Sequence, residues 1–161
     1  MAVFVQIEGM NLREGAGKSG VIIDMKMTKA ERLAIELSAC KAINKLFHAN
    51  ASNQRIPFSV GGPSHEFDIF QEGVIVGGVS TSPLKVGKGS PNTGGKDRVA
   101  SELLWLTLWP GSEKRVHVLT DKDLADWLYN TYKGASFPKP IAIYHYETSS
   151  DTLTEIGELS A

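Results

Sequence analysis

Residues 56–79, IPFSVGGPSHEFDIFQEGVIVGGV, decide the predicted fold of this chain. Three short runs in this stretch alternate apolar and polar side chains, and the sequences GGPS and QEG separate the runs. A period of two residues is typical of half-buried strands, and Gly, Pro and Ser favour the turns between strands. The stretch therefore predicts an antiparallel meander of three strands.

A helix is predicted immediately upstream, over residues 28–47. Thr28 and Glu31 have the spacing of a capping box, in which each side chain accepts a hydrogen bond from the backbone N–H of the other residue. Two further strands are expected before this helix, at residues 3–7 and 21–27, joined by a glycine-rich loop. Apolar residues recur at helical spacing and predict that one stripe of the helix packs on a sheet: Ala30, Leu33, Ala34, Leu37, Cys40, Ile43 and Phe47.

A β-hairpin is predicted downstream, over residues 103–119. LLWLTLW and RVHVL are both rich in β-forming residues, and a Pro-Gly turn lies between them. Alternation along the first strand puts its leucines on one face and its tryptophans on the opposite, open face. The leucines are Leu104, Leu106 and Leu108, and the tryptophans are Trp105 and Trp109.

A second helix and a last strand complete the predicted elements. The helix begins with a cap at residues 120–123 and carries Leu124 and Leu128 on its apolar side. Gly134 is expected to end it in a left-handed C-terminal cap. IAIYHY, 141–146, alternates as a strand, and residues 147–161 form an acidic C-terminal segment without Lys or Arg.

The order of these elements predicts a single α+β domain over residues 1–161. Strands in runs with helices at two places favour a mainly antiparallel sheet with two helices packed on one face. A chain of 161 residues is long enough to bury one substantial core.

Composition excludes several classes of protein. With 42% apolar and 22% charged residues and a net charge of −1, the chain is typical of a soluble globular domain, not of a disordered or histone-like binder. No stretch has the apolar length of a membrane span or the pattern of a secretion signal. Cys40 is the single cysteine, so an internal disulfide is impossible. A cytoplasmic protein without a membrane partner is expected.

The most unusual stretch is the long basic, glycine-rich loop at residues 80–98. It carries four cations against one acid: Lys85, Lys88, Lys96 and Arg98 against Asp97. Loops of this length are commonly functional. One interpretation is an anion-binding loop for a nucleotide, a signalling phosphate, a nucleic acid or an acidic partner. The other is a solvated extension without function.

Three carboxylates are candidates for a metal site: Asp68, Glu102 and Asp121. Acidic residues from strands and a helix bind divalent metals in nucleases of the ribonuclease-H type. However, the predicted strand at 103–109 replaces the helix that such a nuclease needs. Asp121 also has a sufficient role at the start of a helix, where negative charge is favourable.

Histidines and aromatic residues predict a binding surface in preference to a reactive one. The four histidines lack metal-binding spacing, and His117 and His145 are expected on the polar face of their strands. If Trp105 and Trp109, with Tyr144 and Tyr146, face outward, they offer large contact area to a partner. A second apolar layer beneath the basic loop is the alternative.

The C-terminal third resembles the ending of a family of bacterial polymorphic-toxin immunity proteins. The residues that carry the resemblance are Asp121, Leu124, Leu128, Gly134, Pro138, Ile141 and Tyr144. The resemblance covers roughly thirty residues of strand, capped helix, Gly-to-Pro break and strand. It implies an inhibitor that blocks a protein partner by surface complementarity, without chemistry of its own.

The sequence therefore favours a non-catalytic, cytoplasmic binding or inhibitor protein, an immunity or counter-defence factor, with no catalytic residue, metal or cofactor. Its oligomeric state is left open. The alternatives are a metal-dependent phosphodiesterase that uses Asp68, Glu102 and Asp121, and a phosphate binder that uses the loop 85–98. The expected binding residues are Lys85, Lys88, Lys96, Arg98, Trp105, Trp109, His117, Tyr144 and Tyr146.

Overall fold

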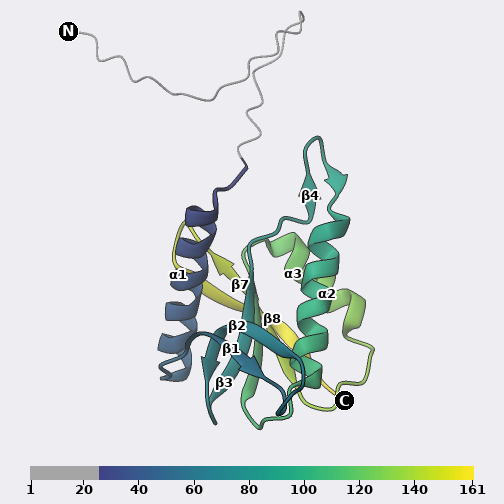
Figure 1. Cartoon of the computed structure of the whole chain (residues 1–161). Coiled ribbons are helices and arrows are strands. Elements are labelled where there is room, and N and C mark those ends of the chain that lie inside the picture. The colour runs from purple at the N-terminus through teal and green to yellow at the C-terminus, as the bar shows by residue number, and fades with distance from the viewer. Residues whose placement is uncertain (1–25) are drawn as a thin grey trace, which may run out of the picture.

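The structure is a computed structural model, and it describes residues 26–161 (Figure 1). The strand predicted at residues 3–7, the glycine-rich loop after it and most of the strand predicted at 21–27 lie outside this range. The elements are α1 (Lys29–Phe47), β1 (Ser52–Pro57), β2 (Ser64–Gln71), β3 (Ile75–Ser80), β4 (Lys85–Val86), β5 (Ser90–Pro91), α2 (Thr93–Leu108), β6 (Lys114–Leu119), α3 (Lys122–Tyr132), β7 (Ile141–Glu147) and β8 (Thr152–Leu159).

Six strands form one sheet in the order β1-β2-β3-β6-β7-β8. The predicted meander β1-β2-β3 is antiparallel, as is the pair β7-β8. Between them, β3, β6 and β7 run parallel, with α2 and α3 as the connections. The α+β class with a mainly antiparallel sheet is confirmed, and a parallel β3-α2-β6-α3-β7 segment that the sequence reading did not expect lies at its centre.

The helices cover both faces of the sheet (Figure 1). α2 and α3 pack together on one face, where their leucines join the inner residues of β2, β3, β6 and β7. α1 packs on the other face through Ala39, Cys40 and Ile43. Two helices do share a face, but the helix predicted at 28–47 is not one of them.

The prediction of a β-hairpin over residues 103–119 is wrong. Residues 103–108 are the last turns of α2, and β6 pairs with β3 and β7 instead. The helix begins far upstream, where the Asn92 side chain caps it by accepting a hydrogen bond from the Gly95 N–H at 2.9 Å. Val99, Leu103 and Leu106 are then spaced at i, i+4 and i+7 and form the buried stripe.

The other predicted elements are present, with three differences. The stripe predicted for α1 is wrong in its first half, because Leu33 and Leu37 are each 52% exposed, and only Cys40 and Ile43 of the stripe are buried. Thr28 and Glu31 form the predicted capping box of α1, and Asp121 caps α3. Gly134 is not a left-handed cap, because α3 ends at Lys133 in right-handed geometry. Most of the acidic segment 147–161 is a strand, β8, at the edge of the sheet, where its charged residues oppose pairing with another chain.

Within residues 26–161, no helix has the length and apolar character needed to cross a membrane.

Candidate functional site

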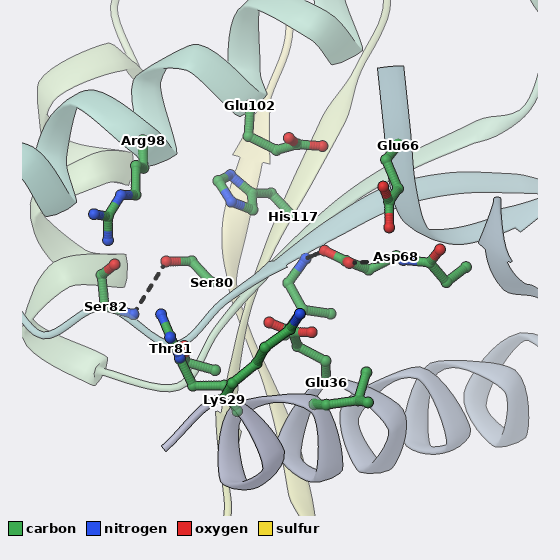
Figure 2. Close-up of a pocket in the computed structure, with 14 residues that line it drawn as sticks. Lys29, Glu36, Glu66, Asp68, Ser80, Thr81, Ser82, Arg98, Glu102 and His117 are labelled. Carbon is green, nitrogen blue, oxygen red and sulfur yellow. Dashed lines mark hydrogen bonds between the residues drawn. The ribbon is translucent and has the colours of Figure 1, made fainter. Parts of the chain in front are cut away.

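A cleft of about 690 Å³ lies at the carboxyl end of β3, between α1 and α2. α1 supplies Lys29, Arg32 and Glu36 to one wall, and α2 supplies Arg98 and Glu102 to the other (Figure 2). β2, the end of β3 and β6 lie between the two walls. The carboxyl ends of parallel strands are a common place for binding sites in sheets covered on both faces.

The cleft opens where β2 and β3 part. Their ladder ends at the pair Ile69–Gly77, so beyond this point β2 and β3 no longer pair with each other. At this point the Asp68 carboxylate replaces the backbone of β2 as the hydrogen-bond partner of β3: its Oδ2 accepts a hydrogen bond from the Val79 N–H at 2.8 Å. Its Oδ1 accepts a second hydrogen bond from the Asn53 side chain at 3.3 Å. Asp68 is therefore fixed against the end of β3.

Glu102 reaches the same place from α2. Its carboxylate lies over Gly78, where an added Cβ would be 2.5 Å from Glu102 Oε1. Gly78 is buried in the middle of the sheet, paired in register with His117 of β6. A glycine inside a strand often marks such a close approach. The absence of a side chain at position 78 makes room for the Glu102 carboxylate. Gly78 directly precedes Val79, whose N–H binds Asp68.

Two buried polar atoms within residues 26–161 have no hydrogen-bond partner, and both line the cleft. They are Glu102 Oε1 and His117 Nδ1. The other Glu102 oxygen, Oε2, pairs with His65 Nε2 at 2.9 Å, and the His65 ring stacks on Trp105. Because unsatisfied buried polar groups are rare, each of these two atoms needs a partner that the described part of the chain does not supply.

The surroundings in the cleft disfavour the charged forms of its acids. Burial raises the pKa of Asp68, and the negative charge of Glu102 raises it further, against the lowering effect of the Val79 N–H. Burial and the charge of Asp68 also raise the pKa of Glu36. His117, only 1% exposed, has its pKa lowered by burial to about 4, so its imidazole is neutral at pH 7.

Cations and hydroxyl groups surround these acids. Lys29 and Arg32 lie on the α1 wall and Arg98 lies on the α2 wall (Figure 2). Within the described chain, none of the three forms an ion pair with a carboxylate. The end of β3 and the next two residues add Ser80, Thr81 and Ser82. Cations and hydroxyls at this edge are suited to the oxygens of a phosphate.

Asp68 and Glu102 are oxygen donors of the kind that a divalent cation binds. Mg²⁺ prefers oxygen ligands and is commonly held by one or two carboxylates, with water and substrate phosphate completing its shell. Asp68 and the unpaired Glu102 Oε1 offer that donor set. No group of three His, Cys, Asp or Glu side chains in the described part of the chain is arranged to hold a metal ion.

Of the three carboxylates proposed from the sequence, the structure brings two together. Asp68 and Glu102 both line the cleft, whereas Asp121 does not. Asp121 Oδ1 accepts a hydrogen bond from the Leu124 N–H at 2.7 Å and caps α3. The prediction that Asp121 joins a metal site is therefore wrong, and its capping role is confirmed.

The basic loop 80–98 divides into three parts. Its beginning lines the cleft, its middle forms the β4–β5 hairpin with Lys85 and Lys88, and its end is the first turns of α2. Arg98 lines the cleft. Lys96 does not, since its Nζ lies 4.8 Å from the centre of the Trp127 ring.

The predicted exposed aromatic surface is wrong. Trp109, Tyr144 and Tyr146 are 8%, 4% and 2% exposed, and Trp105 is partly buried against the core. The two tyrosines belong to the core beneath α1. The alternative interpretation, a second apolar layer, describes their packing better.

The two strand histidines are also buried, not solvated. His117 lies beside Gly78 in the cleft, and His145 is 8% exposed. They are not cross-strand partners, because β6 and β7 pair His117 with Ile143 and His145 with Leu119.

Sequence reasoning missed four charged residues of the cleft: Lys29, Arg32, Glu36 and Glu66. The first three lie on α1, for which the sequence predicted only the apolar stripe. The signal that was available is the pair Gly77-Gly78 inside a predicted strand, since interior glycines mark a close approach of other groups.

Comparisons with protein-family models, with curated proteins and with solved structures find no match to this chain.

Proposed function

We propose that this protein hydrolyses phosphodiesters with a divalent cation held between Asp68 and Glu102. One observation carries the proposal: the two unpaired buried polar atoms of the described chain, Glu102 Oε1 and His117 Nδ1, lie in the cleft that also holds Asp68. Such an arrangement costs folding free energy, because the acids repel each other and remain partly unsatisfied. A positive ion between the carboxylates offsets that cost.

The residues of the cleft have distinct roles in this reaction. Asp68 and Glu102 bind the cation, and Arg98, Lys29 and Arg32 bind the phosphate oxygens that the cation leaves free. When bound, the cation supplies a polarised phosphoryl oxygen and an acidified water. In the overall reaction, water adds to phosphorus, the bond from phosphorus to the ester oxygen breaks, and that oxygen leaves with a proton.

His65 acts on Glu102 as a positioning residue. Its Nε2 holds Glu102 Oε2 at 2.9 Å, and stacking on Trp105 fixes the plane of its ring. This arrangement leaves Glu102 Oε1, which has no hydrogen-bond partner in the described chain, as the oxygen that would bind the cation. The proposal differs from the sequence-based expectation of a protein without metal or cofactor.

The test is hydrolysis of bis(4-nitrophenyl) phosphate with Mg²⁺ or Mn²⁺, compared with EDTA. Glu102→Gln and Asp68→Asn are expected to lower the rate by about 10²- to 10³-fold, the usual effect of removing a group that stabilises transition-state charge. Asp97→Asn is the matched control, since Asp97 is an exposed acid of α2 outside the cleft. Activity that is absent with every divalent ion, or that survives in Glu102→Gln, contradicts the proposal.

A non-catalytic binding protein, including the inhibitor or immunity factor that the sequence favours, is the second candidate. The observation in its favour is the exposure of leucines on two helices: Leu33 and Leu37 of α1 are each 52% exposed, and Leu104 and Leu108 of α2 are each 56% exposed. Exposed apolar groups that gather on one face mark interaction surfaces. Under this candidate, Leu104→Asp with Leu108→Asp abolishes binding to the partner, and Glu102→Gln leaves it unchanged.

A further inference from the structure

The β4–β5 hairpin is attached to the rim of the cleft at both of its ends. The chain leaves the cleft at Ser82, forms the hairpin, and returns through α2, which carries Arg98 into the cleft. Asn92 fastens the base: its side chain donates to the Pro83 carbonyl at 2.7 Å, and its N–H donates to the Leu84 carbonyl at 2.9 Å. The hairpin is therefore an extension of the cleft wall.

The tip of the hairpin presents a lysine to solvent. Lys88 lies between Gly87 and Gly89, whose φ angles are 54° and 90°, values that favour glycine. The Gly89 N–H donates to the Val86 carbonyl at 3.2 Å and closes the turn. A Cβ added at either glycine would meet nothing within 4 Å, and Figure 1 shows the hairpin projecting beyond the body of the molecule.

Exposed cations extend from this tip across the cleft to α1. Lys85 and Lys88 lie on the hairpin, Arg98 on α2, and Lys29 and Arg32 on the first turn of α1. All five are exposed, and the ion pairs within residues 26–161 involve none of them. Figure 1 shows the start of α1 and the hairpin at the same end of the molecule. The described chain thus has cations without ion-pair partners both in the cleft, beside its four acids, and on the hairpin outside it.

We propose that this row of cations binds the backbone of a polynucleotide, so that the phosphodiester in the cleft is one link of a nucleic-acid chain. This inference rests on the proposed function. Lys88 lies six positions after Ser82, which allows the tip to stand at most about 20 Å from the cleft. That reach corresponds to about six base pairs at 3.4 Å each. A mononucleotide in the cleft would leave Lys85 and Lys88 without an anion, whereas a continuous backbone reaches them.

The experiment measures binding and cleavage separately. Binding of a fluorescein-labelled 20-nucleotide DNA, single-stranded and duplex, is followed by anisotropy from 50 to 200 mM salt, in Ca²⁺ and with Glu102→Gln to prevent turnover. The double variant Lys85→Ala/Lys88→Ala is expected to weaken binding about ten-fold or more at low salt. It is also expected to reduce the log–log salt slope by about 1.8 for duplex or about 1.4 for single-stranded DNA.

The matched control is Lys45→Ala/Lys133→Ala, which removes the same charge from exposed lysines at the far ends of α1 and α3. This control is expected to keep wild-type binding. Hydrolysis of bis(4-nitrophenyl) phosphate is expected to be unchanged in the hairpin variant, since that substrate fits within the cleft.

The outcomes separate the two proposals. If the hairpin variant binds and cleaves DNA like the wild type, or if the wild type binds no DNA, the polynucleotide inference is overturned while hydrolysis of the small diester can still stand. If DNA binding depends on the hairpin but neither substrate is hydrolysed, the surface stands and the phosphodiesterase function is overturned.

Discussion

Arg115 and His117 are both buried and lie two residues apart on β6, but they differ in how far the protein satisfies their hydrogen bonds. Arg115 is 3% exposed, and its guanidinium donates to four carbonyl groups, those of Leu106, Trp109, Gly111 and Glu113. His117 is 1% exposed, and its Nδ1 has no partner. The first group is satisfied by the fold itself, while the second has a ring nitrogen that the described part of the chain leaves without a partner.

The carboxylates near these two residues differ in the same way. Burial alone would raise the pKa of Glu113. However, its carboxylate accepts hydrogen bonds from the Gly73 N–H at 3.0 Å and the Trp109 indole N–H at 2.7 Å. Together with the charge of Arg115, these hydrogen bonds bring the pKa of Glu113 below its ordinary value. For Asp68, burial and the charge of Glu102 prevail and raise the pKa. A buried charge with enough hydrogen-bond and ion partners, such as that of Glu113, has a structural role. A buried acid with a raised pKa, such as Asp68, is a candidate for a functional role.

Replacement of Arg115 by Leu should have the largest effect on stability. It leaves the carbonyls at the carboxyl end of α2 buried without donors, which is expected to cost about 3–5 kcal/mol of unfolding free energy. Urea denaturation measures it. Arg55→Leu is the control, since the exposed pair of Arg55 with Glu66 contributes about 1 kcal/mol or less. Equal losses in the two variants would show that Arg115 is not a structural centre.

Acid should destabilise the protein through His117. Because the folded pKa is lowered from 6.5 to about 4, the stabilising neutral form is fully present above the unfolded pKa and its contribution is lost as pH falls from about 6.5 to 4. That interval corresponds to about 3 kcal/mol. The unfolding free energy of the wild type, measured relative to that of His117→Leu, should fall by about this amount from pH 7 to pH 4. A difference that does not depend on pH would count against a neutral, buried His117.

Gly78→Ala should disturb the cleft and leave the structural centre around Arg115 intact. The new methyl group would approach Glu102 Oε1 at 2.5 Å, and the flexible carboxylate would move away. Diester hydrolysis is expected to fall by about 10- to 100-fold while the protein stays folded by circular dichroism. Gly134→Ala is the control, because nothing lies within 4 Å of a Cβ at that position. Full activity in Gly78→Ala would mean that the position of Glu102 over β3 has no role in catalysis.

Asp68→Asn should make the protein more stable at pH 7. An acid with a raised folded pKa carries a penalty that appears as pH rises above the unfolded pKa near 3.8 and is complete above the folded pKa. Removing the charge is expected to raise Tm at pH 7 and to abolish stabilisation by Mg²⁺. Calorimetry at pH 7 and pH 3 measures both effects. Lower stability at pH 7 would show that Asp68 is satisfied without a cation.

The sequence predicted the elements whose local signals are complete. The capping box at Thr28 and Glu31, the turns of the meander and the cap at Asp121 are each contained within a few residues, so α1, β1–β3, α3 and β7 were found. α2 was missed because LLWLTLW alternates like a strand, while its N-cap, Asn92, lies eleven residues earlier in what was assigned to the loop. β8 was hidden by its acidic composition, since its strand character depends on pairing with β7.

The site was predicted in part. Asp68 and Glu102 were named as candidates, but their meeting depends on α2 being a helix that crosses over β3, which no local pattern reveals. The placement of α1 on the opposite face also determined that Lys29, Arg32 and Glu36 turn toward the cleft. Such long-range packing decides which polar residues converge.

The parting of β2 and β3 also places the cleft at the junction of two separate apolar layers. α1 belongs to the layer on one face and α2 to the layer on the other, and each contributes a wall. A bound molecule therefore touches both halves at once. Its occupancy would tie their local opening motions together, so that amide hydrogens of α1 and α2 slow their exchange with solvent in concert.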